Sequence, residues 1–445
     1  MHDGEDFSLV TRSSDGQMLF LANMLSKMKH DTPLGSRIAE VHNGSSLFTG
    51  DAGQGESNIR RWVIENDWLE AIVALPLNMF YNTDIATYIW VITNRKGTSR
   101  QGRIQLIDAR SRFQPLRRNL GKKNCELSPD NIEWICRVFL TEEESADSKF
   151  FDNRAFGFWE VPICRPQRLH SRLDPEAFTS LRFASGDRGI RQDLHAAIGD
   201  RLFTDFEQVR GKLESILESW NEDEGEENGS NVAGENVRIS ERRKKRIMNP
   251  GTWKRDARLY ALAELLRDEL GDQLYEDHNI FRDVVRTTLK KHGQDVTLSD
   301  LKAIFRAVSW RVETAPPVVK RVLSSKKAPP DPLHGLYERN IEGTSATVEY
   351  EPDNDIRDFE LVPLLEPDGL DGYIAREVIT NTPDAWIDLK GVKIGYNLHF
   401  ERHFERYIQP TTTGALEAMI VQAAEAAQSE VVDYFTPTTE HEPAE

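Results

Sequence analysis

The chain has 445 residues, of which 39% are hydrophobic, and its formal net charge at pH 7 is −17. This length predicts two or three domains with ordinary cores, and the negative charge argues against a surface that binds nucleic acid over its whole extent. The three cysteines form no CxxC pair and no run of about 18 apolar residues occurs, so we expect a reduced, cytoplasmic protein without a membrane span.

The first 108 residues carry the pattern of an α/β domain. Asp15 precedes apolar residues at helical spacing, which predicts a capped helix over residues 15–29. Apolar runs of strand length, bounded by Gly, Pro or Asn, predict buried strands. These runs cover residues 37–42, 69–76, 80–94 and 103–108, and a helical pattern covers residues 59–67. Strands that alternate with a helix form an open α/β sheet.

The pattern is less regular after residue 108, and a mainly helical region is predicted after residue 174. Ser128, followed by Pro129, caps a predicted helix that extends to residue 139. Further helical patterns cover residues 193–220, 254–270, 279–292 and 299–312, with Ser299 as the cap of the last. Residues 221–234 are acidic and rich in Gly and Asn, which predicts a flexible linker. Residues 414–427 form a last helix of strong intrinsic propensity.

This pattern predicts four segments. Residues 1–174 form the α/β domain, and residues 175–237 form a helix and the acidic linker. Residues 238–330, which open with a basic run, form a small helical region. Residues 331–445 form a mixed C-terminal segment that ends in a helix and a tail predicted to be disordered.

Two separated groups of motifs resemble one protein family. The first group lies in the α/β domain and includes Ile59-Arg-Arg, Tyr81-Asn-Thr and Ala86-Thr-Tyr-Ile-Trp90. The second group lies near the C-terminus and includes Pro383-Asp-Ala-Trp-Ile-Asp388 and His399-Phe-Glu-Arg-His-Phe404. In this order they resemble the modification (M) subunit of type I restriction–modification systems. Members of that family are S-adenosylmethionine-dependent adenine-N6 DNA methyltransferases that act with a specificity subunit and a restriction subunit.

The family's catalytic motif is absent from the printed sequence. An adenine amino group is a poor nucleophile, and the family accepts its hydrogens with an (Asn/Asp)-Pro-Pro-(Phe/Tyr) loop. The two Pro-Pro pairs here are Pro316-Pro317 and Pro329-Pro330, and neither has that context. The family's glycine-rich cofactor loop is absent as well. We therefore expect an N-terminally truncated chain that supplies the C-terminal half of the methyltransferase sheet, without catalytic or cofactor-binding residues, and that does not bind S-adenosylmethionine alone.

The resemblance implies where the target base would be held. A base must leave the duplex before such an enzyme can reach it, and aromatic side chains stack on it. Phe80, with Tyr81 beside it, matches the family's stacking position, and Asn43 and Gly44 are expected at the same rim. The alternative for Phe80, an aromatic side chain of the core, is given equal weight.

Three further groups of residues have a functional and a structural interpretation. Arg60 and Arg61 are candidates for contact with the DNA backbone, although solvated charges are the more ordinary interpretation. The glycine-containing loop over residues 50–55 lacks the Lys-Ser/Thr of a phosphate loop, which favours a surface loop. His399 and His403 have no evident third ligand, so no metal site is predicted.

Three residues depart from the family pattern inside the matched motifs. Glu40 stands where an aliphatic residue is expected, and a buried carboxylate without a partner is costly. Asp84 replaces a glycine and would be strained at positive φ, and Ser46 replaces a proline.

Two hypotheses about function remain open from the sequence. In the first, the chain is a methyltransferase component that pairs with a separately encoded N-terminal half along the open edge of strand 37–42, or is a poorly stable remnant. In the second, it is a non-catalytic protein that binds the specificity subunit or DNA. In both, the helix from Gly414 is the candidate contact with the specificity subunit.

Overall fold

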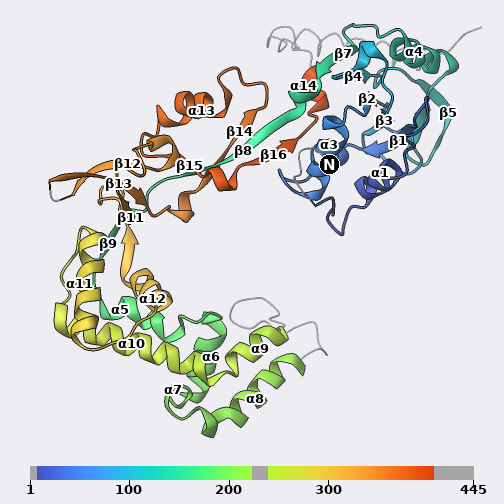
Figure 1. Ribbon diagram of the computed structural model, residues 1–445. Helices are drawn as coiled ribbons and strands as arrows, with labels where there is room; N and C mark the ends of the chain where they lie inside the picture. The colour runs from blue at the N-terminus through green and yellow to red at the C-terminus, as the bar shows by residue number, and fades with distance from the viewer. Residues whose placement is uncertain (1–7, 223–238, 342, 405–445) are drawn as a thin grey trace, which may run out of the picture. The chain divides into compact units, whose positions relative to one another are not determined.

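The computed structural model describes residues 8–222, 239–341 and 343–404 (Figure 1). Contacts divide the chain into two compact units. The first comprises Met1–Gly157 and Gly395–Glu445, and the second comprises Phe158–Ile394. No helix among the described residues has both the length and the apolar character that a membrane span requires.

The first unit is built on a mixed five-stranded sheet. The strand order is β1-β3-β2-β4-β7, and the β2–β4 pair is parallel while the other pairs are antiparallel. The strands are β1 (Arg37–Asn43), β2 (Leu69–Ala74), β3 (Thr87–Thr93), β4 (Arg103–Asp108) and β7 (Ser148–Asp152). Every residue of β2 is buried, as expected for a central strand whose apolar run continues without alternation. The predicted α/β class is confirmed.

The described part of the first unit contains five helices. Helix α4 (Pro129–Leu140) contacts β4, and its residue Val138 shares a buried cluster with Val73 and Ile107. The predicted cap is confirmed, because Ser128 accepts a hydrogen bond from the Asn131 N–H. The remaining helices of this unit are α1 (Gln17–Leu25), α2 (Ser45–Phe48), α3 (Gly55–Glu65) and α14 (Phe400–Phe404), with 3₁₀ turns at Thr98–Arg100 and Asn153–Phe156.

Strand β1 has an open edge. The Gly44 N–H donates to Ala86 O, and the Asn94 N–H donates to Ser36 O, at the two ends of the β1–β3 ladder. In an antiparallel ladder the hydrogen-bonded pairs alternate, so the backbone groups of Ala39 and Val41 point away from β3. Among the described residues β1 pairs with β3 alone, which agrees with the open edge predicted for residues 37–42.

A two-stranded antiparallel ribbon follows β4 in the chain. It consists of β5 (Gln114–Leu120) and β6 (Lys123–Glu126), joined at Gly121, which has a φ of +60°. Glycine suits this position because a side chain at positive φ would be strained.

The second unit combines small sheets with helices. One sheet has the order β14-β8-β15, and β16 also pairs with β8; a second has the order β11-β13-β12, and β9 pairs with β10. These strands are β8 (Gly157–Cys164), β9 (Leu169–Ser171), β10 (Ser309–Arg311), β11 (Val319–Leu323), β12 (Tyr337–Ile341), β13 (Thr344–Tyr350), β14 (Asp358–Pro363), β15 (Trp386–Ile387) and β16 (Lys393–Tyr396).

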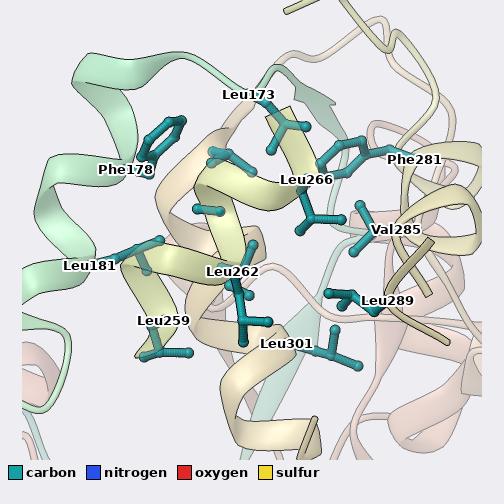
Figure 2. Close-up of a cluster of buried hydrophobic side chains, with 13 residues drawn as sticks. Leu173, Phe178, Leu181, Leu259, Leu262, Leu266, Phe281, Val285, Leu289 and Leu301 are labelled. Atoms are coloured by element: carbon teal, nitrogen blue, oxygen red, sulfur yellow. The ribbon is translucent and has the colours of Figure 1, made fainter. Parts of the chain in front are cut away.

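The helical part of this unit has two hydrophobic cores. In one of them Leu173 and Phe178 pack with Leu266 and Phe281 (Figure 2). The helices are α5 (Pro175–Phe178), α6 (Arg188–Ile198), α7 (Arg201–Thr204), α8 (Phe206–Glu222), α9 (Glu241–Ile247), α10 (Pro250–Leu270), α11 (His278–Lys291), α12 (Leu298–Val308) and α13 (Gly369–Ile374). The second core joins α6, α7 and α8 to α9 and to Trp253 of α10. Both cores therefore combine residues from before and after the predicted division at 237/238.

Two predictions about these helices need correction. The single helix expected over residues 193–220 is divided into α6, α7 and α8, because Gly199 ends α6 with a φ of +85°. The cap of α12 is Thr297, whose side chain accepts from the Asp300 N–H, and not Ser299. Most of the predicted acidic linker and the helix from Gly414 lie outside the described residues.

The core of Figure 2 provides a direct test of the helical packing. Leu266 is fully buried in α10, so Leu266→Ala is expected to lower the free energy of unfolding by about 2–5 kcal/mol. Leu298, at the start of α12, is 72% exposed, so Leu298→Ala should cost no more than about 0.5 kcal/mol. Denaturant unfolding followed by circular dichroism measures both, and equal costs would contradict the packing.

Candidate functional site

Asn43 and Gly44 form the turn at the end of β1. The Asn43 Oδ1 accepts hydrogen bonds from Gln17 Nε2 and from the Ser45 N–H, both at 2.9 Å. The Asn43 N–H in turn donates to Gln17 Oε1 at 3.2 Å. The side-chain oxygen of Asn43 thus holds the turn, and its expected place at the rim of a base pocket remains a prediction.

A polar cluster not anticipated from the sequence supports this turn. Gln17, in the first turn of α1, also donates to Asp15 Oδ2 at 2.9 Å and to Ser45 Oγ at 2.7 Å. Burial raises the pKa of Asp15, but the hydrogen bonds from Gln17 and Ser45 outweigh it, and the pKa falls below its ordinary value. The carboxylate therefore stays charged at neutral pH and fixes Gln17 against β1.

Phe80 and Tyr81 lie on the loop that connects β2 to β3. Their side chains are 36% and 67% exposed, so Phe80 is not an aromatic residue of the core. The last residue of this loop, Ala86, accepts a hydrogen bond from the Gly44 N–H at 3.1 Å. The structure thus joins the loop that carries the two aromatic rings to the turn that contains Asn43 and Gly44.

The β5–β6 ribbon braces this aromatic loop from the other side. Lys123 Nζ donates to Met79 O at 3.0 Å, and the Asn124 N–H donates to Asn78 O at 3.1 Å. The Cys125 Sγ lies 3.1 Å from Leu77 O. Consecutive residues of β6 therefore hold consecutive carbonyl groups of the loop. The predicted sequence elements did not include the ribbon, although Gly121 between two polar stretches was a usable turn signal.

The residues that depart from the family pattern are accommodated. Asp84 does not have a positive φ; that conformation occurs at Asn82, with a φ of 56°, and Asp84 lies 2.9 Å from Lys122 Nζ. Ser46 is buried and its Oγ donates to Asn43 O at 2.8 Å.

Glu40, for which no partner was expected, lies beside a histidine. Its Oε2 is 3.1 Å from His42 Nε2. Burial raises the pKa of Glu40 and lowers the pKa of His42 to about 4, against the opposing charge of Asp15. At neutral pH the imidazole is therefore uncharged, and the contact is not an ion pair.

Arg60 is not available for DNA contact, which corrects the prediction. It is completely buried, and its Nη1 donates to Thr49 O at 2.9 Å and to Ser46 O at 3.1 Å. Its Nε donates to Tyr396 O, and its Nη2 donates to Asn397 Oδ1 at 3.0 Å. Burial lowers the pKa of Arg60 to about 9, with the charge of Glu56 opposing, so it remains protonated at neutral pH.

Arg61 is also engaged within the chain. Its Nε lies 2.9 Å from Glu65 Oε1, one helical turn further along α3, and the two side chains are 15% and 21% exposed. A contact between Arg61 and the DNA backbone remains a prediction.

The glycine-containing loop does not form a cradle for a phosphate or for S-adenosylmethionine. A Cβ at Gly55 would lie only 2.1 Å from Val10 O, and Asn58 Nδ2 donates to Gly53 O at 3.0 Å and to Ser8 O at 2.8 Å. The N-terminal segment therefore fills the space that an open anion-binding loop would need.

His399 and His403 point to different neighbours. The His399 ring stacks on Phe48 at 6.5 Å, and the His403 ring lies 4.3 Å from Phe151. Within the described part of the chain, no group of three or more His, Cys, Asp or Glu residues could hold a metal ion.

The structural role of Arg60 can be tested against Arg61. Arg60→Met would leave the carbonyls of Ser46, Thr49 and Tyr396 without their donor, so we expect the free energy of unfolding to fall by roughly 2–4 kcal/mol. Arg61→Met removes the helical ion pair with Glu65 but leaves no buried carbonyl group of Ser46, Thr49 or Tyr396 without its donor, and it should cost less than about 1 kcal/mol. Denaturant titration of the two variants decides, and an Arg60 variant as stable as the Arg61 variant would refute the role.

Comparison with known proteins finds one family of DNA methylases. Residues 4–155 match the model of the N-6 DNA Methylase family. The MjaIX methylase subunit of a type I restriction enzyme from Methanocaldococcus jannaschii is 28% identical over 195 residues, which are 43% of this chain and 33% of that protein. The MpnII methylase subunit from Mycoplasma pneumoniae is 36% identical over 92 residues, which are 21% of this chain and 16% of that protein.

Solved structures give weaker matches. A type I restriction–modification methyltransferase subunit from Streptococcus thermophilus has a TM-score of 0.27 and 23% identity, covering 32% of this chain and 28% of that one. The chain spans about a third or less of the length of the curated relatives that it matches. The match of residues 4–155 to the N-6 DNA Methylase family model and the methylase subunits named above agree: this part of the chain is similar to modification subunits of type I restriction–modification systems.

Proposed function

We propose that the chain is a component of a type I adenine-N6 DNA methyltransferase and supplies the side of the enzyme that holds the target base. The observation that carries this proposal is the pair of exposed rings of Phe80 and Tyr81 on a braced loop. An exposed aromatic pair has no role in a core, whereas an extruded base needs an aromatic face to stack on. The family match of the surrounding residues supports the same role.

The loop is suited to this task because its backbone is held from two sides. Gly44 binds its last residue, Ala86, and β6 binds residues 77–79. A rigid loop can present Phe80 without the entropy cost of ordering it when the base arrives. Asn43 and Gly44 would then form the rim next to the stacked base.

The acceptor for the amino hydrogens and the site for S-adenosylmethionine would come from another polypeptide segment, which we propose to be separately encoded. Strand β1 offers the place where that segment would join. The backbone groups of Ala39 and Val41 point away from β3, and the Val41 side chain is 48% exposed. A strand added here would satisfy these groups and extend the sheet.

The other proposed partners follow from the family. The specificity subunit would read the DNA sequence, and the restriction subunit would complete the assembly. The helix from Gly414, the proposed contact with the specificity subunit, lies outside the described residues.

Co-expression with an N-terminal methyltransferase half tests the pairing. The chain alone is expected to give no heat on calorimetric titration with S-adenosylmethionine, because its sequence lacks the family's glycine-rich cofactor loop. Together with the second half and a specificity subunit, it should transfer tritiated methyl groups to adenine. Heat with the chain alone would contradict the division of the site, and an assembled complex without methyl transfer would favour a non-catalytic interaction protein.

Replacement of Phe80 tests the stacking role in that assembled enzyme. Because stacking on an aromatic ring is worth about 1–3 kcal/mol per base, Phe80→Ala should slow methyl transfer roughly 5- to 150-fold. Phe80→Tyr keeps the ring and should keep most of the activity. Phe20→Ala on α1 removes another exposed ring, 67% exposed, and serves as the matched control. Equal rates for the two alanine variants would refute stacking by Phe80.

A further inference from the structure

The β5–β6 ribbon is strongly positive on a negative protein. Residues 114–124 contain Arg117, Arg118, Lys122 and Lys123 and no acidic residue, while the whole chain carries a net charge of −17. All of β5 except Leu116 is exposed. A local cluster of cations on a chain of the opposite overall sign concentrates the attraction for an anion in one place.

Arg117 and Arg118 form no ion pair within the described part of the chain. Across residues 8–222, 239–341 and 343–404, neither Arg117 nor Arg118 has a carboxylate within ion-pair distance. Lys122, in contrast, pairs with Asp84 at 2.9 Å, and Lys123 holds Met79 O. The ribbon thus uses its lysines to attach itself to the aromatic loop and leaves its arginines free.

The arginines lie where the ribbon is irregular. Pro115 pairs with Cys125 and Leu120 pairs with Lys123, so residues 116–119 of β5 stand opposite the single residue Asn124 of β6. Such a bulge interrupts the ladder and changes the direction of side chains, and bulges are common beside functional sites. Arg117 and Arg118 both belong to this bulge.

The turn of the ribbon touches the aromatic loop directly. A Cβ at Gly121 would lie 2.3 Å from Asn82 Oδ1 and 3.5 Å from Tyr81 Cε2. The cationic strand and the exposed rings of Phe80 and Tyr81 therefore belong to one surface, fixed by hydrogen bonds from Lys123 Nζ and the Asn124 N–H to carbonyl groups of the loop.

We propose that the β5–β6 ribbon binds the phosphate backbone of duplex DNA next to the target base, through Arg117 and Arg118. Guanidinium groups bind phosphate oxygens with paired hydrogen bonds, and backbone contacts position a protein on the duplex without reading sequence. The ribbon would hold the DNA backbone that flanks the target base, while the aromatic loop receives the base. This inference rests on the proposed function and assigns the DNA contact that the buried Arg60 cannot make.

The test measures binding of the full chain to a labelled duplex by fluorescence anisotropy over a range of salt concentrations. Each lost phosphate contact lowers the slope of log K against log salt by about 0.9. Arg117→Gln with Arg118→Gln should therefore reduce the slope by about 1.8 and weaken binding roughly tenfold at low salt. The double lysine variant, which keeps both charges, should retain the slope.

The matched control removes the same charge elsewhere. Arg188→Gln with Arg201→Gln changes two exposed arginines of the helical region and should leave the slope unchanged. Equal losses in both glutamine variants, or no binding of duplex by the wild type at low salt, would overturn the proposal. So would a loss confined to single-stranded DNA of the same sequence. An unchanged thermal transition shows that the variants are folded.

The two proposals can fail separately. Absence of methyl transfer in the co-expressed assembly would refute the proposed function and leave the anisotropy result as it stands. Duplex binding that is independent of Arg117 and Arg118 would refute the ribbon contact alone.

Discussion

The first unit depends on one buried guanidinium. Arg60 donates to backbone carbonyls of the segment that follows β1 and to Tyr396 O, so a single side chain joins residues 336 positions apart in the sequence. A carbonyl group in a buried place needs a donor, and a guanidinium supplies several in one plane. Arg60 thereby fixes helix α3 relative to the end of β1 and to the chain at residue 396. The turn at Asn43 is supported by the same contacts.

The loop between β2 and β3 combines a fixed backbone with exposed side chains. Backbone carbonyls of the β2–β3 loop are held by β6 and by Gly44, and Leu75 and Met79 anchor the loop to the buried cluster that contains Val73 and Ile107. The rings of Phe80 and Tyr81 remain exposed, and the proposed function assigns them to the stacking of an extruded base.

Four of the five strands of the first unit's sheet could be predicted because their apolar runs match burial, as for residues 69–76 and 103–108. The strand predicted over residues 80–94 begins only at Thr87, and β7 was not predicted. The role of Arg60 could not, because its partners are carbonyl oxygens far away in the sequence, and carbonyls carry no sequence signal. The exposure of Phe80 was undecided for a related reason: a core aromatic and a stacking aromatic have the same local pattern. The ribbon could not be predicted because its residues are mostly polar on both faces. The break at Gly199 could not be predicted because it lies inside an otherwise continuous helical periodicity.

The unsatisfied side of β1 has a consequence for how the protein is made in the cell. A bare strand accepts any strand that reaches it, including a second copy of itself. Newly synthesised chains would then distribute between self-association and the proposed complex according to how much of the proposed second polypeptide is present. In that case the ratio in which the two polypeptides are synthesised would set the yield of the assembled protein.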